Sequence, residues 1–285
     1  MENKIILCPK NGLDNLVKDL IKQDECIILF HISTGDIFTS YPIVMEYLDK
    51  YDKIHIYTLY RNRLTTKQLY ENFAKIEIHE LPNDYNKCVV PNHIYNNLVT
   101  KNTKLIKLGW HDENFSYNPK KDINFWKVFY QQASLDYTIK FKPINIKRNF
   151  KREEFLYNMI KNKYGEKYIF THDHRSYDYK HYDVRRNVYV KKNKDNLPVF
   201  HPNINYYDDD TEHKYYNYWP KFVFNNLLDY CLILEKASEI HITDSCFSCL
   251  ATYLDLSNVK KKYIYTTYDF IDYDPCYKDW NIILS

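Results

Sequence analysis

The stretch Ile27–Ser40, with the sequence IILFHISTGDIFTS, decides the fold of this chain. An apolar strand, Cys26 to Ile32, leads into a short turn that carries Asp36 and then into a helix. A continuous apolar run is typical of a strand buried on both faces of a parallel sheet. A second stretch, Ala237–Leu250 (ASEIHITDSCFSCL), has the same order of strand, aspartate (Asp244) and helix. In open α/β sheets, ligands gather at such corners.

Strand and helix patterns alternate around both stretches. In the first half, strands are expected at 53–59, 75–79 and 104–108, and helices at 37–51, 65–73 and 125–133. In the second half, strands are expected at 168–171, 239–243 and 262–266, helices at 151–163, 222–236 and 245–254, and the apolar tail at 280–284 is expected to dock on the fold. This alternation implies parallel sheets. We therefore predict two Rossmann-like α/β domains facing a cleft, at residues 1–149 and 150–285.

Composition favours an ordinary globular protein of 285 residues. Its 40 basic and 37 acidic residues leave a net charge of +3, which gives no indication of nucleic-acid or membrane-surface binding. We see neither an apolar span of membrane length nor a signal-peptide pattern, so we expect a cytoplasmic protein with no transmembrane segment. The 30 tyrosines, with abundant Asn, Lys and Ile, indicate AT-rich codons of a microbe or virus more than a saccharide site.

The seven cysteines are odd in number and scattered, which argues against a disulfide framework. Two of them form a CxxC, Cys246-Phe247-Ser248-Cys249. Because no second cysteine pair accompanies this motif, we expect both thiols to pack as small apolar groups on a helix and not to bind metal.

Gly35-Asp36 is the first candidate for chemistry. A carboxylate at the start of a helix is stabilised there by backbone N–H groups and the helix dipole, so Asp36 could be a simple capping residue. Alternatively, Asp36 could be a general base aimed at an acceptor hydroxyl in a cleft.

Thr171-His172-Asp173-His174-Arg175 is the second candidate, at the end of a predicted strand. The guanidinium of Arg175 suits phosphate oxygens, and histidines can donate hydrogen bonds to them. His172 and His174 would also lie on one side of a strand, where they could bind zinc. A solvated polar strand end is the third interpretation, and phosphate contact is the one we favour.

Thr243-Asp244-Ser245 is the third candidate. Hydroxyl residues at a helix start can bind phosphate or ribose oxygens, or they can simply cap the helix. The sequence contains no GxGxxG, GxxxxGK[ST] or GxSxG motif, so the usual fingerprints of dinucleotide binding, of P-loops and of nucleophile elbows are missing.

Together these segments resemble GT-B glycosyltransferases, most closely the heptosyltransferase-like superfamily. That family has a Gly-Asp pair after its first strand and a proline a few residues into the helix, which is similar to Gly35-Asp36 and Pro42 here. Its second domain has Asp-Ser/Thr-Gly after a strand and a later His-x-Ala. The matching positions here are Asp244-Ser245-Cys246 and Cys249-Leu250-Ala251, so cysteines replace the glycine and the histidine. His172 and Arg175 also resemble the His-x-Arg element of GDP-fucose-using fucosyltransferases, at a different spacing.

The resemblance implies sugar transfer from a nucleotide-diphosphate donor to a hydroxyl of a glycan or lipid-linked acceptor, without a metal or other cofactor. Asp36 would be the base, which suggests inversion, and Arg175 would neutralise the leaving diphosphate. The implied donor-binding residues of the C-terminal, nucleotide-sugar domain are Thr171, His172, His174, Thr243, Asp244 and Ser245. On the N-terminal, acceptor side they are Gly35, Trp110 and Tyr117. Two alternatives remain: a non-catalytic glycan- or nucleotide-binding protein of this fold, and a zinc hydrolase built on His172, Asp173 and His174.

Overall fold

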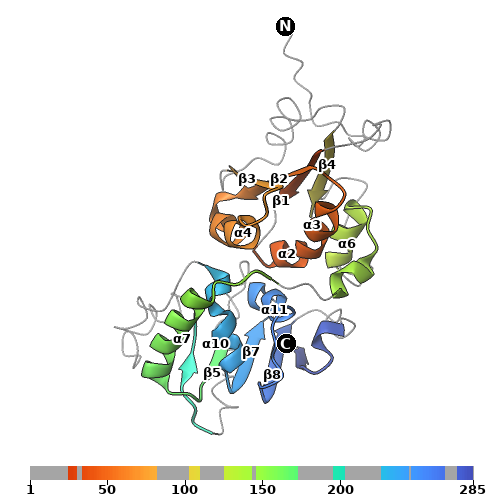
Figure 1. Cartoon of the computed structure of the whole chain (residues 1–285). Helices are drawn as coiled ribbons and strands as arrows, with labels where there is room; N and C mark the ends of the chain where they lie inside the picture. Colours follow the sequence, from red (N-terminus) through yellow and green to blue (C-terminus); the bar gives the residue numbers. More distant parts are fainter. Residues whose placement is uncertain are drawn as a thin grey trace. The chain divides into compact units, whose positions relative to one another are not determined.

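The structure is a computed structural model that describes residues 25–30, 34–81, 103–109, 125–142, 146–172, 195–202, 226–243, 245–266 and 275–284. The chain forms two compact units, Met1–Pro143 and Ile144–Ser285, which are described separately (Figure 1). The first is called unit 1 and the second unit 2. Along the described parts of the chain, no helix is long and apolar enough to cross a membrane.

Unit 1 contains a four-stranded sheet in which every pairing is parallel. Its strand order is β3-β2-β1-β4, with β1 at Glu25–Phe30, β2 at Lys53–Leu59, β3 at Ile76–Leu81 and β4 at Thr103–Leu108. The central strand β1 is flanked on both sides, since Ile28 pairs with Ile56 of β2 and with Ile106 of β4. The continuous apolar run predicted this central place, because both faces of β1 are buried.

The helices of unit 1 are α2 (Thr34–Thr39), α3 (Tyr41–Leu48), α4 (Arg63–Tyr70) and α6 (Phe125–Gln132), with 3-10 turns η1 (Tyr60–Asn62) and η2 (Tyr137–Phe141). The single helix expected at 37–51 was wrong: two short helices meet at Ser40. Pro42, at the start of α3, has no N–H and cannot continue the hydrogen bonds of α2. The break therefore follows from Pro42, which the sequence analysis had placed inside a single helix.

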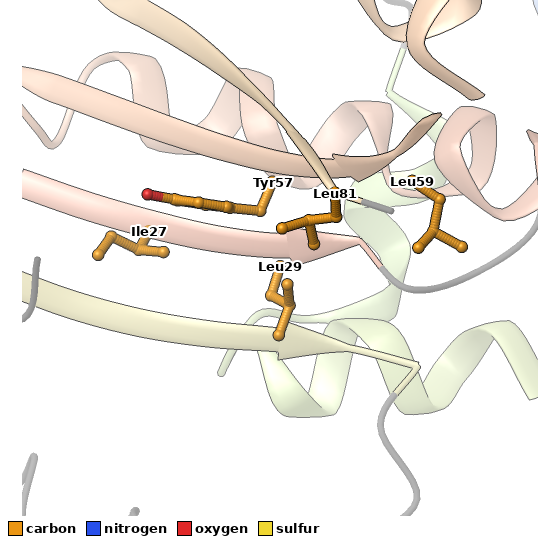
Figure 2. Close-up of a cluster of buried hydrophobic side chains, with 5 residues drawn as sticks. All are labelled: Ile27, Leu29, Tyr57, Leu59 and Leu81. Atoms are coloured by element: carbon orange, nitrogen blue, oxygen red, sulfur yellow. The ribbon is translucent and has the colours of Figure 1, made fainter. Parts of the chain in front are cut away.

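The two faces of the first sheet are packed differently. On one face, the hydroxyls of Thr58 in β2 and Thr66 in α4 lie 2.9 Å apart, and Figure 1 shows α2, α3 and α4 together on one side of the sheet. The other face carries a buried cluster from β1, β2 and β3 (Figure 2). The cluster consists of Ile27, Leu29, Tyr57, Leu59 and Leu81. Burial on both faces explains why β1 lacks apolar–polar alternation.

Unit 2 contains a five-stranded parallel sheet in the order β6-β5-β7-β8-β9. The strands are β5 (Ile169–His172), β6 (Val199–Phe200), β7 (Glu239–Thr243), β8 (Lys261–Thr266) and β9 (Asn281–Leu284). The apolar tail docks as predicted, by forming β9 against β8. β6 was not predicted, because two residues are too short to show a pattern. The α/β class with two parallel sheets is confirmed, whereas the cleft between the domains stays a prediction.

The helices of unit 2 are α7 (Phe150–Tyr164), α10 (Cys231–Lys236) and α11 (Cys246–Ala251), with 3-10 turns η5 (Leu227–Tyr230) and η7 (Pro275–Tyr277). α7 ends at Gly165, whose φ of +86° favours glycine. The helix expected at 222–236 can be compared with the structure over residues 226–236, and there it begins later than expected. Asn226 is extended and its side chain accepts a hydrogen bond from the N–H of Leu228, so helical structure begins only at Leu227. Residues 222–225 lie outside the described residues.

A buried ion-pair network joins α7 to α10. Arg148 donates hydrogen bonds to both Glu153, which is fully buried, and Glu235 of α10. One helical turn away, Arg152 donates to both carboxylate oxygens of the buried Asp229 in η5, at 3.0 and 2.7 Å. Two bidentate arginine–carboxylate pairs therefore fix α7 against η5 and α10.

Buried tyrosines donate hydrogen bonds through their hydroxyl groups to backbone carbonyls in or next to helices. Tyr130 in α6 donates to the carbonyl of Thr39, the last residue of α2, at 2.8 Å. Tyr168 donates to the carbonyl of Ile233 in α10 at 2.7 Å, and Tyr277 donates to that of Ser248 in α11 at 3.0 Å. Tyr47 likewise donates to the carbonyl of Ala133. Many of the tyrosines thus have a structural use, since each fills the core and satisfies a backbone oxygen.

Candidate functional site: the carboxyl edges of the two sheets

Asp36 lies at the carboxyl edge of the first sheet, as the sequence predicts. It is in the first turn of α2, directly after β1, and its side chain is partly exposed. Gly35, in the same turn, is buried. Because β1 lies next to β4 where the strand order reverses, this corner is at a topological switch point, the usual ligand position in an open α/β sheet.

A hydrogen-bond network connects this corner to the next one along the edge. Thr34, two residues before Asp36, donates through Oγ1 to Oδ1 of Asn62 at 2.7 Å. Asn62 follows β2 and is only 2% exposed, and its carbonyl accepts a hydrogen bond from Thr66 of α4. The start of α2 is therefore held by a buried side chain from the neighbouring corner.

The sequence analysis missed the polar side chains that follow β2. Besides Asn62, this corner carries Arg61 and Arg63, whose guanidinium lies 3.6 Å from the ring centre of the exposed Tyr60. Arg63 also donates to the carbonyl of Tyr60 at 2.9 Å. These residues could have been found from the sequence, because β1 and β2 were expected to be parallel and parallel strands have their carboxyl ends at one edge.

In unit 2, two predicted donor-side residues are brought together by the fold. His172 ends β5, and Ser245 follows β7 just before α11. Nδ1 of His172 and Oγ of Ser245 lie 3.0 Å apart. β5 and β7 are neighbours at the point where the order β6-β5-β7-β8-β9 reverses, so this contact spans the switch point of the second sheet.

The turn that holds Ser245 is itself fixed by Ser248. The backbone N–H of Ser245 donates to Oγ of Ser248 at 3.0 Å, and that hydroxyl donates back to the carbonyl of Ser245 at 2.6 Å. Ser248 is fully buried, and its own carbonyl accepts from Tyr277. Ser248 thus constrains the backbone while the hydroxyl of Ser245 is directed at His172.

His201 is a residue of this edge that the sequence analysis did not find. It follows the two-residue strand β6, is fully buried, and its ring centre lies 6.0 Å from that of His172. Phe247 of α11 packs against His172, with ring centres 4.7 Å apart. The edge therefore presents two imidazoles and one hydroxyl from three neighbouring strands.

Two predicted threonines also lie at this edge. Thr171 in β5 is 1% exposed and Thr243, the last residue of β7, is fully buried. Oγ1 of Thr243 has no hydrogen-bond partner among the residues that the structure describes. A buried hydroxyl without a partner at the end of a central strand is unfavourable unless a ligand satisfies it. The other predicted site residues, His174, Arg175, Asp244, Trp110 and Tyr117, lie outside the described residues, as does Asp173.

The cysteines of the CxxC motif pack into the fold. Cys249 is buried on α11. Phe247, which lies between the two cysteines in the sequence, contacts Phe170 and Tyr230. Burial raises the pKa of the Cys246 thiol to about 12, which disfavours the thiolate that binds metal. Within the described residues, neither thiol belongs to a group with metal-ligand spacing.

The fold and its edges define a protein with two Rossmann-like α/β units, each with polar side chains at the carboxyl edge of a parallel sheet. No family model matches the sequence, and no curated protein matches it.

The chain is similar in fold to solved glycosyltransferase structures. A glycosyl transferase family 9 protein from Veillonella parvula DSM 2008 shares 8% identity over 87% of this chain and 82% of its own, with a TM-score of 0.48. The E. coli heptosyltransferase WaaC with ADP shares 13% identity over 85% of this chain and 86% of its own, with a TM-score of 0.41. WaaC with ADP-2-deoxy-2-fluoro heptose shares 12% identity over 85% and 88%, with a TM-score of 0.40. Identities of 8–13% and TM-scores below 0.5 are too low to transfer an activity.

Proposed function

We propose that the chain is a glycosyltransferase that moves a sugar from a nucleotide-diphosphate donor to a hydroxyl of a glycan or glycolipid. The observation that carries the proposal is the 3.0 Å contact between His172 and Ser245. These residues come from segments that the sequence analysis had independently assigned to the donor, and they meet at the switch point of the second sheet.

On the donor side, the Ser245 hydroxyl sets the tautomer of His172. When it donates to Nδ1, the neutral imidazole carries its hydrogen on Nε2, which then acts as a donor toward a phosphate oxygen. The buried Oγ1 of Thr243 supplies a further polar atom for the nucleotide or diphosphate. We assign Arg175, His174 and Asp244 to the same side from their place in the sequence.

On the acceptor side, Asp36 is the proposed general base. Its carboxylate takes the proton of the acceptor hydroxyl as that oxygen bonds to the anomeric carbon. The bond between the anomeric carbon and the phosphate oxygen breaks, and the nucleotide diphosphate leaves with the electron pair. Arg175 and His172 would stabilise the negative charge on the leaving group. Attack from the side opposite to the leaving group inverts the anomeric centre, and no step requires a metal.

The base assignment is tested with Asp36→Asn. We expect turnover to fall by about 10²–10⁴-fold, because the amide cannot accept the proton, while nucleotide affinity stays nearly unchanged. A thermal-shift panel of ADP, GDP, UDP and CDP first identifies which nucleobase the chain prefers. The assay then screens the sugars of that nucleotide for transfer and hydrolysis. Asp49→Asn, at an exposed position after α3, is the matched control. Undiminished turnover in Asp36→Asn would show that another group is the base.

A non-catalytic nucleotide- or glycan-binding protein is the second candidate. One observation favours it: Cys249, where the resembled family has a histidine, is buried on α11 and supplies no strong polar group. Stabilisation by a nucleotide diphosphate, without transfer or hydrolysis of any matching nucleotide sugar, would support this binder and contradict the transferase.

A further inference from the structure

Three metal-ligating side chains lie together on β2 and β3 of unit 1, away from the carboxyl edge. In the parallel register, His55 pairs with Glu77 and Tyr57 pairs with His79. Side chains two apart on a strand point to the same face, so His55, Glu77 and His79 project from one side of the sheet. No motif in the sequence marks this triad, because its first member is separated from the other two by α4.

The distances fit a small divalent ion. Nδ1 of His55 lies 3.0 Å from Nε2 of His79 and 3.6 Å from Oε2 of Glu77, and the other oxygen of Glu77 lies 3.8 Å from Nε2 of His79. Zinc bonds of about 2.0–2.2 Å at tetrahedral angles place ligand atoms about 3.3–3.5 Å apart. We propose that His55, Glu77 and His79 form a binding site for a divalent transition-metal ion of the zinc type.

Each imidazole of the triad has a neighbour that restricts its ring. Nε2 of His55 faces Oε2 of Glu25 at 3.8 Å, so a carboxylate lies behind the ring nitrogen opposite to the site. Metal-binding histidines usually have such a carboxylate or carbonyl partner, which fixes the tautomer. The ring of His79 is stacked on Tyr57, with centres 4.4 Å apart and planes 13° from parallel. His55 thus has a carboxylate behind its ring, and His79 has an aromatic ring against its face.

Burial and access are also suitable. The side chain of His55 is 9% exposed, that of His79 is 26% exposed and that of Glu77 is 48% exposed, so an ion can enter past the glutamate. Three protein ligands leave a fourth position for water, as in open zinc sites.

Lys53 competes with the ion for Glu77. Its Nζ lies 2.6 Å from Oε2 of Glu77, in an ion pair exposed to solvent. An exposed pair of this kind contributes little to stability, so a divalent ion can displace the ammonium group. We therefore expect that removing Lys53 strengthens metal binding. If the histidines and carboxylates had only a structural role, the removal of Lys53 would have no such effect.

The site serves the fold and not the proposed transfer. His55 is four residues before Leu59 at the carboxyl end of β2, a distance of about 13 Å at the usual rise per residue. An ion here bridges the edge strand β3 to β2 and stabilises unit 1 whenever it binds the folded chain only. The inference is independent of the function assigned to the carboxyl edges.

Titration of the full chain, freed of metal with a chelator, tests the proposal with Zn²⁺ and Co²⁺. We expect one ion per chain by calorimetry, a melting temperature several degrees higher, and a Co²⁺ spectrum without thiolate charge-transfer bands. His79→Gln and Glu77→Gln should weaken binding by more than about 100-fold, and Lys53→Met should strengthen it. Glu80→Gln, on β3 but pointing to the opposite face, is the matched control and should bind normally.

Circular dichroism of each metal-free variant separates loss of the site from loss of the fold. Equal affinity in folded Glu77→Gln and in the unmodified chain overturns the proposal, as does a cobalt–thiolate spectrum. Weaker binding in Lys53→Met also contradicts the assigned geometry.

Discussion

At the residue scale, the donor side of unit 2 depends on how one hydroxyl orients one imidazole. Ser245 and Ser248 are three residues apart and have different tasks, because the hydroxyl of Ser248 bonds within its own turn whereas that of Ser245 also reaches His172 on another strand. A pair of substitutions can therefore separate ligand binding from local stability.

Replacing Ser245 with alanine should weaken nucleotide-diphosphate binding by about tenfold, because His172 loses the partner that fixes its tautomer, a loss of about 1–2 kcal/mol. Ser248→Ala is the companion variant, and we expect it mainly to lower the melting temperature by loosening the start of α11. Calorimetric titration with the diphosphate that stabilises the chain measures the first effect. Equal affinity in Ser245→Ala and the unmodified chain would contradict the role given to this hydroxyl.

Two cysteines should be almost inert in the folded chain. Burial raises the pKa of Cys26 and of Cys246 to about 12. At pH 8 their thiolate fraction is roughly a thousandfold below that of an ordinary cysteine, so alkylation should be slow until the chain unfolds. Mass spectrometry after timed treatment with iodoacetamide, with and without denaturant, gives both rates. Fast alkylation of Cys26, which is fully buried in β1, would mean that the first sheet opens readily without denaturant.

At the element scale, α7 is fixed to its neighbours by ion pairs as well as by a buried apolar stripe of Leu156, Ile160 and Tyr164. On its outer side, Phe155 is 62% exposed, whereas on its inner side the carboxylate residue Glu153 is 0% exposed. A buried charge is tolerated only with a well-placed partner, and Arg148 fills that role for both Glu153 and Glu235.

Glu153→Gln should destabilise unit 2 by about 3–5 kcal/mol, because Arg148 keeps its charge in a half-buried position and loses one of its two carboxylates. Glu166→Gln is the control: this carboxylate pairs with Lys161 at the surface, with 73% of its side chain exposed, and should cost less than about 1 kcal/mol. Urea unfolding followed by circular dichroism gives both values. Similar losses in the two variants would show that the Arg148 network adds nothing beyond a surface pair.

At the scale of the whole molecule, the many buried tyrosines set the alkaline limit of stability. Burial raises the pKa of Tyr41 and Tyr51 to about 12, and raises that of the fully buried Tyr70 well above its ordinary value. In the unfolded chain these groups ionise near pH 10. Their contribution to stability is therefore complete below about pH 10 and is lost as the pH rises toward 12.

We expect phenolate absorbance and circular dichroism to change together between about pH 10 and 12, because the buried tyrosines ionise only as the chain unfolds. A titration that follows both signals from pH 7 upward measures this. Complete ionisation near pH 10 with unchanged circular dichroism would show that the tyrosines are accessible to solvent.

Most strands could be predicted from the sequence, and the reasons differ by element. β2 and β7 match their predicted bounds because each contains an alternating Ile-His-Ile pattern that is typical of a strand. The break at Ser40 was missed because Pro42 was expected inside a single helix, although it lacks the N–H that would continue the hydrogen bonds. The late start at Leu227 was missed because the pattern does not show that the Asn226 side chain accepts from the N–H of Leu228. Helical periodicity continues across both points.

Only part of the site could be predicted in this way. The strand ends marked His172 and Ser245 as candidates, but their contact depends on β5 pairing with β7 across a long stretch of chain. His201 was missed because its strand has two residues, and Asn62 because its role depends on Thr34 of another corner. The triad of His55, Glu77 and His79 likewise depends on the register of β2 against β3.

Each sheet is formed by one continuous part of the sequence, and this has a consequence for synthesis on the ribosome. All described strands of the first sheet precede residue 143, so that sheet can form while the second half of the chain is still being translated. The second sheet lacks its edge strand until residues 281–284 have emerged to pair with β8. Until then β8 presents an unpaired edge, and the nascent chain is open to aggregation or to binding by chaperones at that strand.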